Sequence, residues 1–187
     1  MKNLKQLIAV AIIVSASTPA MAVSIGCATS GEDAPLALHK HWIMEGWEKR
    51  EGDPDFVFAE KMARYYDLED PVGVFYDNFA PGAIQLFENS AVYGANWEGL
   101  QADAKSVRHA LTEGHSELLG ERVSSTTIGF VGTLTRLDGT VLPFNGRSQL
   151  GWACDDGKWK IRQELNYAWV VEAADIQHYY DALENDK

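Results

Sequence analysis

Asp77 is the first candidate in this sequence for proton-transfer chemistry. It ends the apolar stretch "VFYD", whose composition is typical of a β-strand. Alternation along a strand places Phe75 and Asp77 on one face, and Val74 and Tyr76 on the other. A carboxylate in apolar surroundings has a raised pKa and can exchange protons near neutral pH. The alternative is a structural Asp that accepts hydrogen bonds from backbone N–H groups of the following turn.

The last two strands are expected to form a hairpin through a two-residue turn, Asp156-Gly157. The pairs that follow from such a turn are Cys154 with Trp159, Trp152 with Ile161, Leu150 with Gln163, and Ser148 with Leu165. This register gives the hairpin one largely apolar face, which we expect to be buried.

Gln163 is then a polar residue on this apolar face. A buried glutamine needs hydrogen-bond partners, and without them its desolvation costs roughly 1–3 kcal/mol. It is either a core amide bonded to the backbone or to Ser148, or a ligand-binding residue that faces a cavity. We carry the second interpretation forward as a prediction.

Aromatic residues are numerous, with six Trp, seven Tyr and seven Phe. Trp42 and Tyr66 fall on predicted helices, and Trp152 and Trp159 fall on the predicted hairpin. Together they are candidates to line an apolar ligand pocket, with the Tyr66 hydroxyl directed inward. The alternative for each of them is a purely structural place in the core.

Other chemistries find little support in the sequence. The five histidines, at positions 39, 41, 109, 115 and 178, have no zinc-binding spacing. The sequence also lacks a glycine-rich phosphate loop and a nucleophile-elbow motif. We therefore predict neither a metal nor a cofactor. The net charge of −11 argues against nucleic acid as a partner, because phosphate binding requires clustered Lys and Arg.

The N-terminus has the features of an export signal. Residues 1–22 combine a basic start, a short apolar run and an A-x-A end, which predicts cleavage after Ala22 and a periplasmic or secreted protein without a membrane span. Residues 23–35 are expected to be a flexible tail. In an oxidising compartment Cys27 and Cys154 are expected to pair, although two free thiols, or a lipid-modified Cys27, are alternatives.

The remaining patterns predict an α+β domain over residues 36–172. Helices are expected over 35–51, 55–70 and 96–114, short strands over 72–79 and 83–88, and long strands over 122–137, 140–154 and 158–171. An acidic helix or tail follows over 173–187. This order predicts three helices packed on one face of a mostly antiparallel sheet.

The stretch "GFVGTLTRLDGTVLPFNGRSQLGWACDDGKWKIRQE" is similar to the C-terminal strands of SnoaL-like proteins. "YYDLEDPVGVFYDNFAPGA" resembles the corner between helix and first strand in the same family, so the resemblance covers about residues 38–170. This family belongs to the nuclear-transport-factor-like superfamily, which also holds ketosteroid isomerases and polyketide cyclases. The resemblance implies a cone-shaped, strongly curved sheet with a pocket on its concave face, and frequent homodimers.

The same resemblance places Asp77 where ketosteroid isomerases carry their general base. The tyrosine that those isomerases carry on the first helix has no match, because Met44 or its neighbours fall there. Gln163 and Leu165 stand where SnoaL-like proteins tend to carry histidines. These departures leave Asp77 as the single candidate acid/base.

Two functions remain as expectations. The first is an exported protein that binds a small apolar or aromatic molecule, with Asp77 available for isomerase-, cyclase- or dehydratase-type chemistry. The second is a non-catalytic, dimeric protein-interaction module. Whether the protein is an enzyme is left open by the sequence.

Overall fold

The computed structural model describes residues 26–79 and 85–185, so the predicted signal segment 1–22 lies outside the described part. Its helices are α1 (Pro35–His41), the π-helical turn η1 (Trp42–Gly46), α2 (Phe58–Met62), α3 (Ser90–Ala102) and α4 (Ala173–Asn185). Its strands are β1 (Val72–Asp77), β2 (Leu86–Asn89), β3 (Ala104–Leu111), β4 (Ser116–Leu119), β5 (Val123–Arg136), β6 (Val141–Asp155) and β7 (Lys158–Val170). Across these residues, no helix is both long and apolar enough to span a membrane.

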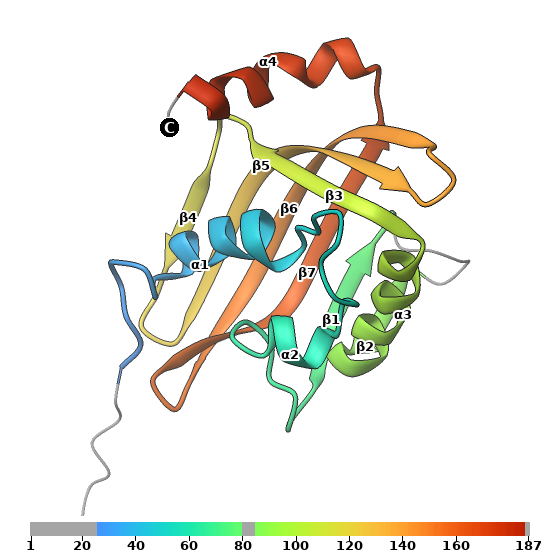
Figure 1. The fold of residues 1–187 in the computed structure, drawn as a ribbon. Coiled ribbons are helices and arrows are strands. Elements are labelled where there is room, and N and C mark those ends of the chain that lie inside the picture. Colours follow the sequence, from blue (N-terminus) through green and yellow to red (C-terminus); the bar gives the residue numbers. More distant parts are fainter. Residues whose placement is uncertain (1–25, 80–84, 186–187) are drawn as a thin grey trace, which may run out of the picture.

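The strands form one seven-stranded sheet in the order β2-β1-β7-β6-β5-β3, with β4 also paired to β5. All pairs are antiparallel except β1 with β7. Figure 1 shows that the sheet is strongly curved and that α1, α2 and α3 lie against its concave side. The predicted α+β architecture, with three helices on the concave face, is confirmed.

The two predicted hairpin turns are present. Asp156 and Gly157 both have positive φ, 44° and 76°, as a two-residue type I′ turn requires. Gly139, in the other Asp-Gly pair, has φ 87°. Glycine adopts such angles at no steric cost, and for this reason the two pairs were recognisable in the sequence.

The helices are shorter than predicted. The expected helix over 35–51 ends its α-helical part at His41, continues as η1 and stops at Gly46. The expected helix over 55–70 is reduced to α2, which begins after Val57, a residue whose side chain makes no capping hydrogen bond. The N–H of Phe58 is instead bonded to Glu98 Oε1 on α3, at 2.8 Å. A tertiary contact therefore replaces the local cap.

The third predicted helix divides into a helix and a strand. Asn89 caps α3, since its Oδ1 accepts hydrogen bonds from the N–H groups of Ala91 and Val92. The second half of the predicted helix, from Ala104 onward, forms β3, which pairs along its length with β5. Pairing with a long neighbouring strand outweighs the helical pattern of these residues, because strand preference depends largely on context.

The β6–β7 hairpin follows the predicted register only near its turn. Cys154 pairs with Trp159 and Trp152 with Ile161, as expected. The register then shifts, so that Gly151 pairs with Gln163 and Arg162 is an extra residue on β7. Such a β-bulge moves every later side chain of the strand to the opposite face of the sheet.

This bulge overturns the prediction for Gln163. Its side chain and that of Leu165 are exposed, whereas Glu164 and Asn166 are buried. Leu150 pairs with Glu164 and Ser148 with Asn166, one residue beyond the predicted partners. The polar residues on the concave face are therefore a carboxyl and an amide that the predicted register had turned outward.

Cys27 and Cys154 form a disulfide with a Cα–Cα distance of 5.7 Å, as predicted. The pairing leaves no thiol on Cys27 for lipid modification. It holds the N-terminal segment against the hairpin, where Trp159 Nε1 donates a hydrogen bond to the carbonyl of Ala28 at 2.7 Å. The part of the predicted tail from Gly26 onward is thus fixed to the domain.

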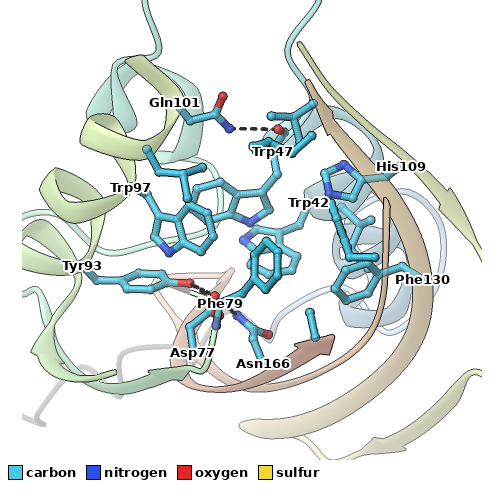
Figure 2. Close-up of a pocket in the computed structure, with 16 residues that line it drawn as sticks. Trp42, Trp47, Asp77, Phe79, Tyr93, Trp97, Gln101, His109, Phe130 and Asn166 are labelled. Atoms are coloured by element: carbon cyan, nitrogen blue, oxygen red, sulfur yellow. Dashed lines mark hydrogen bonds between the residues drawn. The ribbon is translucent and has the colours of Figure 1, made fainter. Parts of the chain in front are cut away.

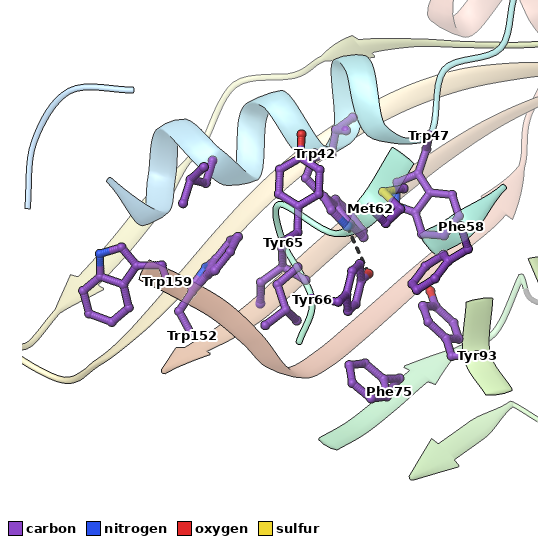
Figure 3. Close-up of a cluster of buried hydrophobic side chains, with 14 of the residues drawn as sticks. Trp42, Trp47, Phe58, Met62, Tyr65, Tyr66, Phe75, Tyr93, Trp152 and Trp159 are labelled. Atoms are coloured by element: carbon purple, nitrogen blue, oxygen red, sulfur yellow. Dashed lines mark hydrogen bonds between the residues drawn. The ribbon is translucent and has the colours of Figure 1, made fainter. Parts of the chain in front are cut away.

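The concave face is filled largely by aromatic side chains (Figure 3). Trp42, Tyr66 and Phe58 belong to one continuous buried cluster with Phe75 and Tyr93. On the opposite face, α4 packs through Ile176 and Tyr180 against Ala110 and Val131 of the sheet. The predicted C-terminal helix therefore covers part of the convex side.

Candidate active site

A pocket lies between the concave sheet and the helices (Figure 2). Its volume is about 70 Å³. Its walls are mostly aromatic, and they include Trp42, Trp47, Phe79, Trp97, Phe130 and Phe144. Walls of this kind favour an apolar ligand, since they exclude water and offer few hydrogen bonds.

Polar groups gather at one end of the pocket, where Asp77, Tyr93 and Asn166 meet (Figure 2). The Tyr93 hydroxyl donates a hydrogen bond to Asp77 Oδ2 at 3.2 Å. Asn166 Nδ2 lies 3.5 Å from the same oxygen. The backbone N–H of Phe79 donates to Asp77 Oδ1 at 2.8 Å. Asp77 thus lines the pocket and is also bonded to its own turn, so its structural role does not remove it from the pocket.

A second carboxyl group, Glu164, lies behind this end and is completely buried. Asn166 Nδ2 donates to Glu164 Oε2 at 2.8 Å, and the hydroxyl of Tyr66 donates to Glu164 Oε1. Tyr66 in turn accepts a hydrogen bond from Trp42 Nε1 at 3.0 Å. Tyr93 also bonds Glu164, so its hydroxyl connects the two carboxyl groups.

Burial determines the protonation of this network. It is the main cause that raises the pKa of Glu164 to about 8; the bond from Tyr66 opposes the rise, and the nearby Asp77 adds to it. Burial likewise raises the pKa values of Tyr66 and Tyr93 well above the ordinary value. At pH 7 Glu164 therefore carries its proton and both tyrosines keep their hydroxyl hydrogens.

Three structural features hold these groups in place. The parallel pairing of β1 with β7 sets Asp77 beside Asn166. Ser148 of β6 donates a hydrogen bond to Asn166 Oδ1 at 2.7 Å, which orients the amide with its nitrogen toward the carboxyl groups. Helix α3 presents Tyr93 from the other side, with its ring stacked on Phe75 at a centroid distance of 5.5 Å.

Helix α3 approaches α2 closely because residue 94 is glycine. A Cβ added to Gly94 would lie 2.3 Å from the ring of Phe58, which is closer than any real contact. The neighbouring Tyr93 reaches Asp77 only when α3 lies this near. Gly94 thus contributes to the site because it lets α3 pack close to α2.

The arrangement places two carboxyl groups in different environments. Asp77, at the pocket surface, accepts hydrogen bonds from Phe79, Tyr93 and Asn166. Glu164, out of contact with the pocket, stores a proton at neutral pH. Two carboxyl groups separated in this way are suited to take up a proton from a ligand and to return it.

The predicted site residues have different outcomes. Asp77 and Trp42 line the pocket. Tyr66 does send its hydroxyl inward, but it bonds Glu164 and does not line the pocket. Trp152 and Trp159 are core residues elsewhere, next to Thr126 and Ala28 respectively. For these two tryptophans and for Gln163, the predicted place at the ligand pocket is wrong.

Sequence reasoning missed Tyr93, Glu164, Asn166 and His109. Tyr93 and His109 lie in segments whose element type or bounds were predicted incorrectly, and Glu164 and Asn166 follow the bulge. The sequence "ELN" contained one indication of the site. If Glu164 and Asn166 lie on the buried face of their strand, they form a polar cluster near Asp77. That signal becomes readable only once the register is known.

The first prediction concerns the stability of the network as a function of pH. Because burial raises the pKa of Glu164 from 4.5 to about 8, the folded state binds a proton in this range that the unfolded state has released. The free energy of unfolding should therefore fall as pH rises from 6.5 to 8, by up to about 1.4 kcal/mol per pH unit. Urea titrations at several pH values measure this slope.

The matched variant is Glu164→Gln, which keeps the shape and cannot titrate. It should flatten the slope between pH 6.5 and 8. Below pH 6.5 two buried histidines oppose Glu164, because burial lowers the pKa of His39 to about 3 and that of His109 to about 4. An equal slope in both proteins would show that Glu164 titrates normally.

Comparison with known proteins supports the fold alone. The sequence matches no family model and no curated protein. A conserved protein from Planctomyces limnophilus is similar in structure, with a TM-score of 0.52, 16% identity, and coverage of 72% of this chain and 92% of that one. An NTF2-like superfamily protein from Salmonella enterica has a TM-score of 0.48 at 14% identity, over 56% of this chain and 72% of that one. The order of elements and the curved sheet with helices on its concave side agree with the sequence resemblance: this chain has the NTF2-like cone fold.

Proposed function

We propose that this protein is exported, binds a small, mostly apolar molecule in its cone pocket, and exchanges a proton with that molecule through Asp77. The observation that carries the proposal is the division of the pocket into aromatic walls and one polar end. The proton of Glu164, held behind this end, supports chemistry beyond binding. Isomerisation and dehydration are the reaction classes that need one such acid/base at an apolar site.

The size of the pocket restricts the ligand. A dry cavity of about 150 Å³ admits benzene, and the volume here is about 70 Å³. A compact molecule of a few heavy atoms fits directly. A ring enters when partly exposed side chains at the edge of the pocket, Phe79 and Trp97 among them, rotate aside.

The ligand's polar group is expected to lie against Asp77. A hydroxyl or an acidic C–H beside a carbonyl can donate to its carboxylate, while Tyr93 and Asn166 hold that carboxylate in position. Because the surrounding walls exclude water, this contact is stronger than the same contact in solution.

Phenol, an aromatic ring with one hydroxyl, is a suitable probe. We predict that it binds with a dissociation constant on the order of 1 mM, within the range for a ligand of its size. The indole N–H signals of Trp42, Trp47 and Trp97, followed by ¹H–¹⁵N NMR, should shift, because all three tryptophans line the pocket. Asp77→Asn should weaken binding about five- to tenfold, since it removes a charge-assisted hydrogen bond.

The control pair changes the same residue type in two places. Ala168→Leu adds bulk inside the pocket and should abolish the shifts, while Ala91→Leu makes the same change on an exposed position of α3 and should leave them unchanged. Equal phenol affinity in both variants would contradict binding in this pocket.

The convex face supports a second proposal, that the protein forms a homodimer. Leu165, Tyr167 and Trp169 of β7 are 41%, 55% and 44% exposed. They border a shallow groove on the part of the sheet beside Arg147. An exposed row of large apolar side chains on an open sheet face is typical of a protein interface. This proposal needs no activity and is compatible with the first.

Sedimentation velocity tests the dimer. We predict a dimer at micromolar concentrations and a monomer for the double variant Leu165→Glu/Trp169→Glu. Val92→Glu, which alters an apolar residue of α3 that is 58% exposed, should remain dimeric. A monomeric wild-type protein at about 100 μM, where interfaces of standard size are saturated, would refute the proposal.

A further inference from the structure

His109 lines the same pocket at a distance from the Asp77 end (Figure 2). It comes from β3, at the far side of the sheet from β1, and the curvature of the sheet brings both residues to one pocket. The ring is 7% exposed and packs edge-on against Phe130 and Phe144, with centroid distances of 5.9 and 5.8 Å.

His109 has one unused hydrogen-bonding position within the described residues. Its Nδ1 is buried and has no hydrogen-bond partner there. Burial lowers the pKa of His109 to about 4, with a smaller contribution from Lys61, so the ring is neutral at pH 7. A neutral imidazole has one donor and one acceptor nitrogen, and a buried polar atom without a partner costs free energy.

Two other residues that line the pocket share this condition. Trp97 Nε1 and Gln101 Oε1 are also buried and unpaired among the residues that the structure describes. At the opposite end, by contrast, Tyr93 and Asn166 are bonded to Asp77. The pocket therefore has one polar end that is internally satisfied, and other lining residues with polar atoms that lack partners.

We propose that His109 is a second ligand-binding residue and that the natural ligand carries two hydrogen-bonding groups on a small apolar body. One group meets Asp77 and the other meets His109. The ligand class is then a compact ring or short chain with a hydroxyl or carbonyl at each end, in place of a purely apolar molecule. This inference rests on the proposed function, because it assigns the far end of the same ligand.

The test compares phenol with hydroquinone, which has a second hydroxyl on the opposite side of the same ring. The dissociation constants of both compounds are measured under argon from the indole N–H shifts. Wild-type protein should bind hydroquinone about ten times more tightly than phenol. Two equivalent hydroxyls account for a statistical factor of about two, and the added hydrogen bond accounts for the remainder.

Two variants assign this gain to His109. His109→Phe keeps an aromatic ring against Phe130 and Phe144 but has no ring nitrogen, so it should reduce the preference for hydroquinone over phenol to the statistical factor. His109→Gln restores a hydrogen-bonding group and should recover part of the preference, which a purely structural role for His109 would not produce.

The possible failures are distinguishable. If phenol binds and hydroquinone gains no more than the statistical factor, the partner of His109 is a trapped water or nothing, and this inference is wrong while the proposed function stands. An undiminished preference in both variants would also overturn it. If neither compound binds, the proposed function and this inference fail together.

Discussion

The β-bulge at Arg162 is the constraint on which the site depends. Arg162 donates hydrogen bonds to Asp67 Oδ2 at 2.8 Å and to the carbonyls of Asp70 and Val72, so it ties β7 to the segment that leads into β1. The extra residue reverses the faces of β7, and Glu164 and Asn166 consequently point into the concave side. The parallel pairing with β1 begins just beyond the bulge, at Gln163, and it brings Asp77 next to Asn166. One extra residue thus turns Glu164 and Asn166 inward, and the strand pairing that follows it places Asp77 beside them.

Two buried carboxyl groups in one network are costly unless at least one is neutral and each is hydrogen-bonded. The structure meets both conditions, since Glu164 retains a proton at pH 7 and donors surround each carboxyl. A core built only for stability would be expected to use apolar residues at these positions, because buried charge pairs seldom gain over well-packed hydrophobic side chains. The network therefore has a functional interpretation, and the aromatic pocket beside it gives that function a place to act.

The sequence predicted what local chemistry controls and failed where distant pairing decides. The Asp-Gly turns, the long strands, the disulfide and the place of Asp77 were predictable, because turn geometry, strand composition and the number of cysteines point to them directly. The bulge was not, since the residue that holds Arg162 there, Asp67, lies 95 residues away in the sequence. Residues 104–111 were predicted as helix for a similar reason, because their strand partner β5 follows later in the chain. Both errors affected the predicted site. The wrong register placed Gln163 in the pocket, and the wrong element type concealed His109.

The site as described requires that Glu164 is turned inward and holds a proton at neutral pH. Carbon-detected NMR of the Glu164 side-chain carboxyl, assigned by its loss in Glu164→Gln and followed from pH 4 to pH 10, measures its pKa directly. We predict a midpoint of about 8. A midpoint near 4.5, the ordinary value of a glutamate, would contradict this and show that Glu164 is ionised at neutral pH and holds no proton behind the pocket.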